Sequence, residues 1–189
     1  YMDFTPEIVH NALSTLQAQG CILYPTDTIW GIGCDARSDK GVAKLYALKQ
    51  RQDSKALICL VADLVMLEKY VGPIDPILLP YLNEKRPTTI IYPKVEGISD
   101  QLKAADGSVG IRIAKDTFCQ TLIRALGAPL VSTSANTSGA ESPTEFTLIG
   151  AEIKKGVDAI VPLRQEEKRS LASRIIRLQA NGKIEILRP

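Results

Sequence analysis

The chain has 189 residues, of which 45% are apolar and 23% charged, and its formal net charge is +2. This balance is typical of globular proteins and excludes a disordered chain. No stretch approaches the roughly 20 apolar residues that span a bilayer, and no basic-then-apolar signal segment opens the sequence. We therefore expect a cytoplasmic protein without membrane contact, folded as one domain over residues 1–189.

The N-terminal part of the chain predicts helices separated by short apolar strands. The first helix has Thr5 as its N-cap, Pro6 in its first position and Gly20 as its stop. Ser38 caps the second predicted helix. The expected elements are helices at 5–20, 38–51 and 63–71 and strands at 21–24 and 56–61.

The C-terminal part predicts mainly strands. They are expected at 88–93, 108–114, 129–133 and 158–163, with a helix at 117–126. Residues 173–187 form two β-rich runs joined at Asn181-Gly182, a pair that supplies the positive φ angles of a tight hairpin. Because the helices interrupt the strands without regular βαβ alternation, the sequence predicts a single-domain α/β fold with a twisted mixed sheet and flanking helices.

The cysteines and the histidine exclude several kinds of site. The four cysteines are scattered without a C-x-x-C pair, so we expect no structural metal. His10 is the only histidine and falls on the first predicted helix, where we expect it at the surface. Ser-His and Cys-His nucleophiles need a base beside them, and the sequence offers none.

Residues 31–36 read GIGCDA and match the relaxed dinucleotide-binding pattern G-x-G-x-x-A, whereas no P-loop pattern is present. The dinucleotide pattern normally follows a strand directly and opens a helix. Here PTDTIW separates Gly31 from the preceding strand, and the helix cap comes only at Ser38. An NAD-linked enzyme is therefore a weak alternative, which binding of a reduced cofactor would reveal.

Cations gather after the second predicted helix, where Lys49, Arg51 and Lys55 lie within seven residues. Cations at a helix C-terminus interact favourably with its dipole, which is one explanation. They would also form a clamp for a polyphosphate, with arginine as a planar fork and lysine as a mobile charge. The sequence leaves both interpretations open.

Two further stretches carry polar groups in apolar surroundings. Arg112 stands inside the run SVGIRIA. A buried arginine must be paired, so we expect a carboxylate beside it, either from a substrate or from Asp106 or Asp116. Residues 130–139, LVSTSANTSG, carry hydroxyls and an amide that either satisfy their own turn or wait for a ligand.

Taken in order, these stretches resemble the YrdC-like family of threonylcarbamoyl-AMP synthases in its short, single-domain form. The resemblance runs from YPTDTIWGIGCDA through LKQR, SVGIRIA, STSANTSG and SPT to SRII and ILRP. It implies a YrdC-like fold and a nucleotidyltransferase that combines L-threonine, bicarbonate and ATP into threonylcarbamoyl-AMP and pyrophosphate. It also implies that the product serves the threonylcarbamoyladenosine modification of tRNA.

The resemblance assigns roles to individual residues. Lys49 and Arg51 match the family's K-x-R pair near the phosphates, and Ser134 and Asn136 match its S-x-N signature. It implies Lys49 and Arg51 as catalytic residues, Arg51, Lys55, Ser108, Asn136, Thr144 and Arg188 as ATP-binding residues, Thr28, Arg112, Ser134 and Ser173 as threonine-binding residues, and no metal ligand.

The resemblance also implies a cofactor and partners. Mg²⁺ is expected only together with ATP, bicarbonate as a substrate, and tRNA and a downstream tRNA threonylcarbamoyl-transferase complex as partners. The alternative is a non-catalytic RNA-binding module that uses the same basic concave surface. Only 5% of the residues are aromatic, which leaves few stacking platforms for bases.

The chain departs from the family pattern at several positions. Ala56 replaces the usual proline after Lys55, and Leu60 replaces a histidine at the amino-acid end of the site. Arg174 replaces a small hydroxyl residue in the family's S-T-[IV]-[IV] motif. We expect these changes to affect the threonine pocket more than the fold.

Overall fold

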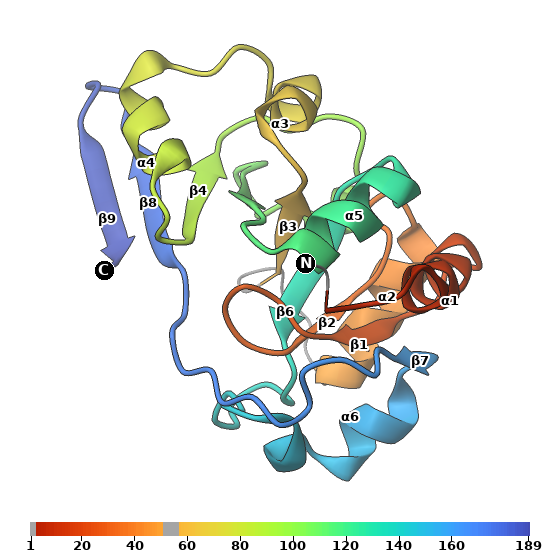
Figure 1. Cartoon of the computed structure of the whole chain (residues 1–189). Helices are drawn as coiled ribbons and strands as arrows, with labels where there is room; N and C mark the ends of the chain where they lie inside the picture. Colours follow the sequence, from red (N-terminus) through yellow and green to blue (C-terminus); the bar gives the residue numbers. More distant parts are fainter. Residues whose placement is uncertain (1–2, 51–56) are drawn as a thin grey trace.

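The computed structural model describes residues 3–50 and 57–189. Their strands form a nine-stranded sheet in the order β7-β1-β2-β6-β3-β5-β4-β8-β9 (Figure 1). The strands are β1 (Ile22–Tyr24), β2 (Gly31–Gly33), β3 (Ile58–Val61), β4 (Thr88–Tyr92), β5 (Val109–Ile113), β6 (Leu130–Ser134), β7 (Ala159–Ile160), β8 (Arg174–Leu178) and β9 (Ile184–Arg188). Parallel pairs (β1–β7, β3–β5 and β4–β8) occur beside antiparallel ones, so the predicted mixed sheet is confirmed.

The helices begin largely where the sequence predicts. They are α1 (Pro6–Gln17), α2 (Asp39–Lys49), α3 (Leu64–Val71), α4 (Leu79–Asn83), α5 (Thr117–Leu126) and α6 (Ala151–Gly156), with 3-10 turns η1 (Pro76–Leu78), η2 (Asp100–Leu102) and η3 (Phe146–Leu148). The hydroxyls of Thr5 and Ser38 accept from the backbone N–H groups of Ile8 and Gly41, as caps do. α1 ends earlier than its predicted stop, because Gln19 adopts a positive φ of 62°.

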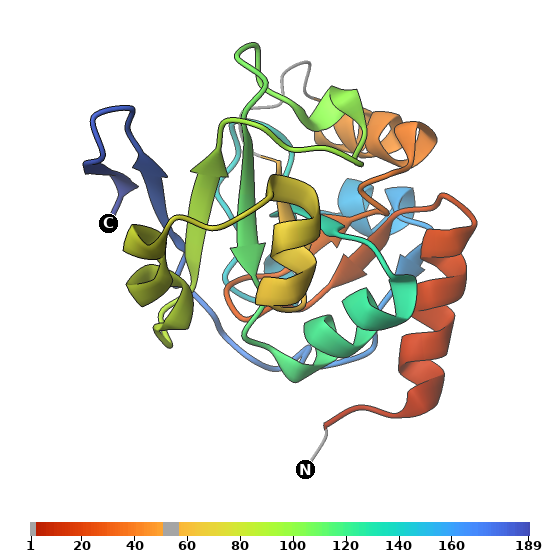
Figure 2. The ribbon, with the colours of Figure 1, turned by 90° about the horizontal axis from the view of Figure 1, so that it is seen from above.

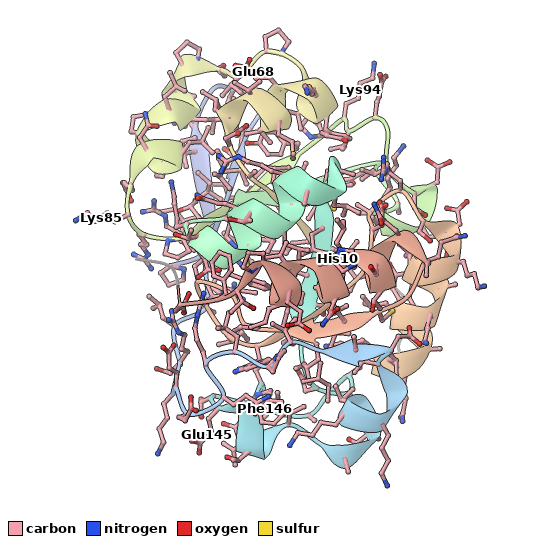
Figure 3. The ribbon with its side chains drawn as sticks, turned by 45° about the vertical axis from the view of Figure 1, so that its right-hand side comes forward. His10, Glu68, Lys85, Lys94, Glu145 and Phe146 are labelled. Carbon is pink, nitrogen blue, oxygen red and sulfur yellow. The ribbon has the colours of Figure 1, made fainter. Side chains whose placement is uncertain are left out.

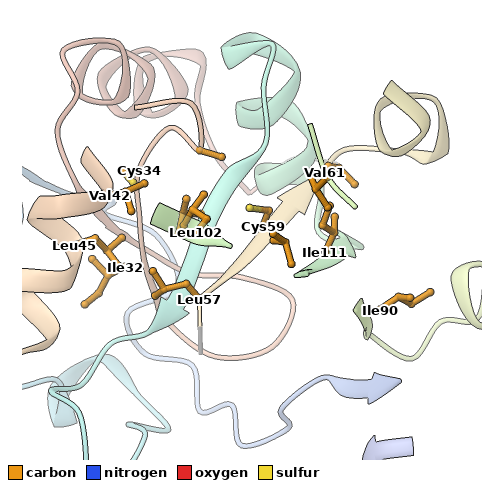
Figure 4. Close-up of a cluster of buried hydrophobic side chains, with 14 of the residues drawn as sticks. Ile32, Cys34, Val42, Leu45, Leu57, Cys59, Val61, Ile90, Leu102 and Ile111 are labelled. Carbon is orange, nitrogen blue, oxygen red and sulfur yellow. The ribbon is translucent and has the colours of Figure 1, made fainter. Parts of the chain in front are cut away.

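Helices pack on both faces of the sheet (Figures 1 and 2). One buried cluster joins the sheet to α2, α3 and α4, and Figure 4 shows part of it around Ile32, Cys34 and Leu45. The other cluster joins the opposite face to α1 and α5. In it the ring of Phe4, which precedes α1, meets the ring of Phe118 on α5 edge to face at 5.4 Å. His10 lies exposed on α1, as predicted (Figure 3).

The motif GIGCDA has a structural role that the sequence interpretation missed. Gly31–Gly33 is strand β2, which pairs with β1 on one side and β6 on the other. A Cβ on Gly33 would lie 2.2 Å from the carbonyl oxygen of Val131, so only glycine fits in this strand. The glycines therefore serve strand packing, and the dinucleotide-binding alternative is wrong, since both glycines lie inside strand β2 and the next helix begins only at Asp39, after the motif has ended.

The C-terminal hairpin β8–β9 forms as predicted, but its turn differs in detail. Gly182 has a φ of 80°, whereas Asn181 is not among the residues with positive φ. The Asn181 side chain instead accepts a hydrogen bond from the backbone N–H of Lys183 at 3.0 Å. Glycine alone supplies the left-handed conformation, and asparagine stabilises the turn through its side chain.

Candidate functional site

The candidate site lies on the face of the sheet that carries α1 and α5. The strand register aligns residues of β6, β3, β5, β4 and β8 in two rows that run across the sheet. The second row continues onto β9. The first row is Ser132, Ile58, Gly110, Ile91 and Arg177, and the second is Leu130, Leu60, Arg112, Thr89, Ile175 and Arg188. Leu130 and Leu60 pack against α5. A cavity of about 620 Å³ is lined by the whole first row and by the part of the second row that runs from Arg112 to Arg188.

Most of the predicted site residues that the structure describes meet at this cavity. Its lining includes Thr28, Ser108, Arg112, Ser134, Thr144, Ser173 and Arg188. Thr144 comes from the loop after β6, and Ser173 from the segment that runs from β7 to β8 (Figure 1). Lys49 and Asn136 do not line the cavity, and Arg51 and Lys55 lie outside the described residues. The structure thus collects side chains that are up to 160 positions apart in the chain.

Arg112 is paired with a carboxylate, but not with either of the predicted ones. Its Nη1 donates to Asp27 Oδ1, and the second oxygen of Asp27 accepts from the backbone N–H of Lys115 at 2.9 Å. Asp116 instead binds Arg164 at 2.6 Å, and Asp106 accepts from the hydroxyl of Ser108 at 2.6 Å. The prediction of a partner was right and the choice between Asp106 and Asp116 was wrong, because the β1–β2 loop folds back over β5.

Arg188 has a different environment at the other side of the cavity. Its Nε donates to the carbonyl oxygen of Ser173 at 2.7 Å, and its Nη2 donates to the Ser173 hydroxyl at 3.2 Å. That hydroxyl also bonds Thr89 Oγ1 at 2.8 Å. Burial and the nearby charge of Arg112 lower the pKa of Arg188. No carboxylate binds Arg188 among the described residues, so the cavity carries a positive charge that an anionic ligand would neutralise.

Lys49 is a buried lysine that binds the end of β6 and the loop after it. It is 1% exposed, and its Nζ donates to the carbonyl oxygen of Ser134 at 2.6 Å and lies 3.3 Å from the Ser134 hydroxyl. The carbonyl oxygen of Lys49 accepts from the backbone N–H of Ser138 at 2.9 Å. The lysine therefore fixes the end of β6 and the loop after it.

In the hydroxyl-rich stretch 130–139, Ser134 and Asn136 have different environments. Ser134 lines the cavity, whereas the Nδ2 of Asn136 donates to the carbonyl oxygens of Thr137 and Ala140, both at 2.9 Å. Asn136 Oδ1 is buried without a partner among the described residues. The turn interpretation thus accounts for the amide nitrogen of Asn136 but not for its buried oxygen.

Sequence reasoning missed some cavity residues, among them Trp30, Asp106 and Arg177. Arg177 binds Glu185 across the hairpin at 2.8 Å. The position of Arg177 could have been inferred. Residues two apart in a strand share a face of the sheet, so Arg177 lies on the same face as Ile175, and both fall in a predicted strand. Trp30 offered no such signal, since its place follows from the path of a loop.

Comparisons with known proteins identify the family. The family model for Sua5, YciO and YrdC proteins, whose description reads "Telomere recombination", matches residues 14–189. The chain belongs to this family. It is 34% identical over 161 residues to the threonylcarbamoyl-AMP synthase of Idiomarina loihiensis, which covers 83% of this chain and 84% of the relative. The corresponding enzyme of Chromohalobacter salexigens is 33% identical over 140 residues, covering 73% and 76%.

A solved structure shows the same fold. P. abyssi Sua5 complexed with L-threonine superposes with a TM-score of 0.82 at 22% identity, covering 96% of this chain. The match includes 53% of the Sua5 chain, so the present chain spans about half the length of that relative.

The departures from the Sua5/YciO/YrdC pattern prove to lie outside the cavity lining where the structure describes them. Leu60 is fully buried under α5. Arg174 turns away from the cavity, binds Glu84 at 2.7 Å and lies over the ring of Tyr81 at 4.8 Å. Because Ser173 and Ile175 line the cavity on either side of it, Arg174 does not occupy the pocket that we expected it to disturb. Ala56 lies outside the described residues.

The described residues contain no group of three or more His, Cys, Asp or Glu side chains that could hold a metal ion. Asp106 is the one carboxylate in the part of the cavity lining that the structure describes. None of the helices in the described part of the chain is long and apolar enough to cross a membrane.

Proposed function

We propose that the chain is an L-threonylcarbamoyladenylate synthase, a nucleotidyltransferase that converts L-threonine, bicarbonate and ATP into threonylcarbamoyl-AMP and pyrophosphate. The observation that carries the proposal is the cavity itself. It combines three arginines, of which Arg188 has no carboxylate partner among the described residues, with a group of small hydroxyls, which suits ligands that bear carboxylate and phosphate groups. Kinship with enzymes named threonylcarbamoyl-AMP synthase supports the same assignment.

The residues divide into two groups in this proposal. Threonine binds among Thr28, Arg112, Ser134 and Ser173, and ATP among Ser108, Asn136, Thr144 and Arg188, with Arg51 and Lys55 as further phosphate ligands. Arg112 supplies donors to the threonine carboxylate from the side that Asp27 leaves open. Arg188 supplies a charge-assisted donor to a phosphate oxygen.

The chemistry suits a site that orients its substrates. The amine of threonine attacks bicarbonate and forms a carbamate with loss of water, and a carbamate oxygen then attacks the α-phosphorus of ATP and displaces pyrophosphate. Among the described residues, the cavity lining holds no histidine or lysine that could serve as a base. We therefore assign catalysis to alignment of the reactants and to stabilisation of phosphate charge, with Lys49 holding Ser134 and Arg51 at the phosphates. Mg²⁺ enters as the companion of ATP, bound by its phosphates.

The RNA-binding alternative gains no support from a specific contact. Among the described residues that line the cavity, Trp30 is the only one with an aromatic side chain, and at 3% exposure it offers no face to a base. We propose tRNA and a threonylcarbamoyl-transferase complex as downstream partners, and the cytoplasm as the compartment.

The test of the function is pyrophosphate release with each substrate omitted in turn. We expect release to require ATP, threonine and bicarbonate together, and threonylcarbamoyl-AMP to appear in equal amount. Release of pyrophosphate without threonine, or none with all three substrates, would contradict the proposal. RNA binding that weakens steeply with salt, in a protein without this activity, would favour the RNA-binding module.

A further inference from the structure

The loop between β1 and β2 contains a short chain of hydrogen bonds whose direction can be deduced. The hydroxyl oxygen of Thr26 lies 2.7 Å from the carbonyl oxygen of Ile29 and 3.0 Å from the hydroxyl oxygen of Thr28. It also accepts from the backbone N–H of Thr28 at 3.0 Å. Thr26 is 1% exposed and does not line the cavity, whereas Thr28 does.

The single hydroxyl proton of Thr26 has only one consistent position. A carbonyl oxygen cannot donate, so a contact of 2.7 Å between two oxygens requires the proton of Thr26 to point at Ile29. Thr26 then has no proton left for Thr28. The bond between the two hydroxyls must therefore run the other way, with Thr28 donating to Thr26.

This direction determines what Thr28 can offer to a ligand. Its one proton is used, and its remaining capacity is to accept. One weak acceptor contact is with Nη2 of Arg112, at 3.4 Å. Thr28 is 6% exposed at the cavity wall, so its other lone pair is the group that a ligand can reach.

We infer that Thr26 is a positioning residue that makes Thr28 an acceptor only, so that Thr28 reads a hydrogen-bond donor on the amino-acid substrate. The inference rests on the proposed function for the identity of that substrate. Arg112, a pure donor, lies beside this acceptor. A donor and an acceptor held side by side are complementary to an amino acid, whose carboxylate accepts and whose amine or side-chain hydroxyl donates.

The test removes the acceptor for the Thr28 proton without touching the ligand. In Thr26→Val the hydroxyl of Thr28 loses its partner and can turn its proton toward the cavity. We expect threonine to bind about tenfold more weakly, the effect of one hydrogen bond, while ATP affinity stays the same. Thr26→Ser keeps a hydroxyl and should restore threonine affinity. Both affinities are measured by calorimetry on the full chain, together with melting of the free protein.

Two further variants make the test specific. Thr28→Val should weaken threonine binding, and adding Thr26→Val to it should cause no further loss, because the two residues act through one contact. The control is Thr121→Val on α5, whose hydroxyl donates to the carbonyl oxygen of Thr117 at 2.8 Å and lies away from the cavity. It should leave threonine affinity unchanged. If Thr26→Val does not fold, Thr26→Ala replaces it.

Substrate analogues distinguish the two donors of the amino acid. If Thr28 reads the side-chain hydroxyl, Thr28→Val weakens threonine binding but not valine binding; if it reads the amine, both weaken alike. Unchanged threonine affinity in Thr26→Val, additive losses in the double variant, or a wild-type protein that does not bind threonine would each overturn the inference. The proposed function fails separately, when a wild-type protein that binds threonine releases no pyrophosphate.

Discussion

Arg112 and Arg188 lie in the same cross-strand row, separated by Thr89 and Ile175, and the charge of Arg112 adds to burial in lowering the pKa of Arg188. Two guanidinium groups on one cavity wall repel each other, and only Arg112 has a carboxylate to offset this. We expect this repulsion to cost stability in the free protein and an anionic ligand to offset the cost. Under the proposed function, Arg188 is a cation because it binds a phosphate group.

Replacement of Arg188 should therefore separate stability from binding. We expect Arg188→Leu to leave the melting temperature of the free protein unchanged or raised, because the exposed guanidinium group of Arg188 has no carboxylate partner among the described residues and is repelled by the charge of Arg112. ATP affinity should fall by the equivalent of about 1.5–3 kcal/mol, the range for a hydrogen bond to a charged group. Calorimetric titration with ATP and thermal unfolding provide the two measurements.

Arg174→Leu is the matched control for Arg188, since Arg174 lies next to Ser173 but binds Glu84 away from the cavity. It should lower the melting temperature and leave ATP affinity unchanged. A loss of stability in Arg188→Leu with normal ATP affinity would mean that Arg188 is a structural residue.

The ion pair between Asp27 and Arg112 should be important for folding. Arg112 is 2% exposed, so Asp27→Asn leaves a buried charge without its counterion. We expect the free energy of unfolding, measured by urea titration, to fall by about 3–5 kcal/mol. Asp100→Asn removes a surface partner of Lys103 and should change the free energy of unfolding far less, because the pair is exposed to solvent. Equal effects of the two variants would contradict the buried pairing.

The sequence predicted the elements of this fold better than the contacts between them. Caps at Thr5 and Ser38 and the hairpin at Gly182 depend on residues close together in the chain, and these predictions were confirmed. Strand β2 was missed because its two glycines carry no side-chain pattern, and its existence depends on pairing with the distant strand β6.

The candidate site shows the same limit. Motifs indicated Thr28, Arg112 and Ser173 as polar groups with a common purpose, and the structure places them on one cavity. The partner of Arg112 could not be deduced, since Asp27 is 85 positions away and only the path of the β1–β2 loop brings it near. The resemblance placed Lys49 near the phosphates, whereas in the structure its Nζ donates to the carbonyl oxygen of Ser134. A motif gives residue types, but it does not give the direction in which a side chain leaves the end of a helix.

Acid should weaken the packing of α2 against the start of β1. Asp158 accepts from Nζ of Lys44 at 2.5 Å and from the backbone N–H of Cys21 at 2.8 Å, and these bonds lower the pKa of Asp158. A carboxylate whose pKa is lower in the folded state stabilises the protein above its unfolded pKa, near 4, and this stabilisation is lost as the pH falls through the folded value. The pair is partly exposed, so we expect a contribution of about 1 kcal/mol or less.

Urea unfolding at a series of pH values measures this contribution. Asp158→Asn should lower the free energy of unfolding at neutral pH and reduce its decline below about pH 4. A variant that declines as steeply as the wild type would show that other carboxylates cause the acid sensitivity.

Ser134 and Asn136, two residues of one motif, should respond differently to replacement by alanine. Asn136 donates two hydrogen bonds that close the turn after β6, so Asn136→Ala should lower the free energy of unfolding of the free protein by about 0.5–2 kcal/mol, as a lost cap does. Ser134 is held by Lys49 mainly through its backbone carbonyl, so Ser134→Ala should leave the stability of the free protein nearly unchanged.

The stabilisation that threonine adds should show the opposite order, with the larger loss in Ser134→Ala. Of these two residues only Ser134 lines the cavity, and stabilisation by a ligand follows its affinity. Thermal unfolding with and without threonine plus ATP, on both variants, measures the two effects. A Ser134→Ala protein with a normal ligand-induced shift would remove this hydroxyl from the site.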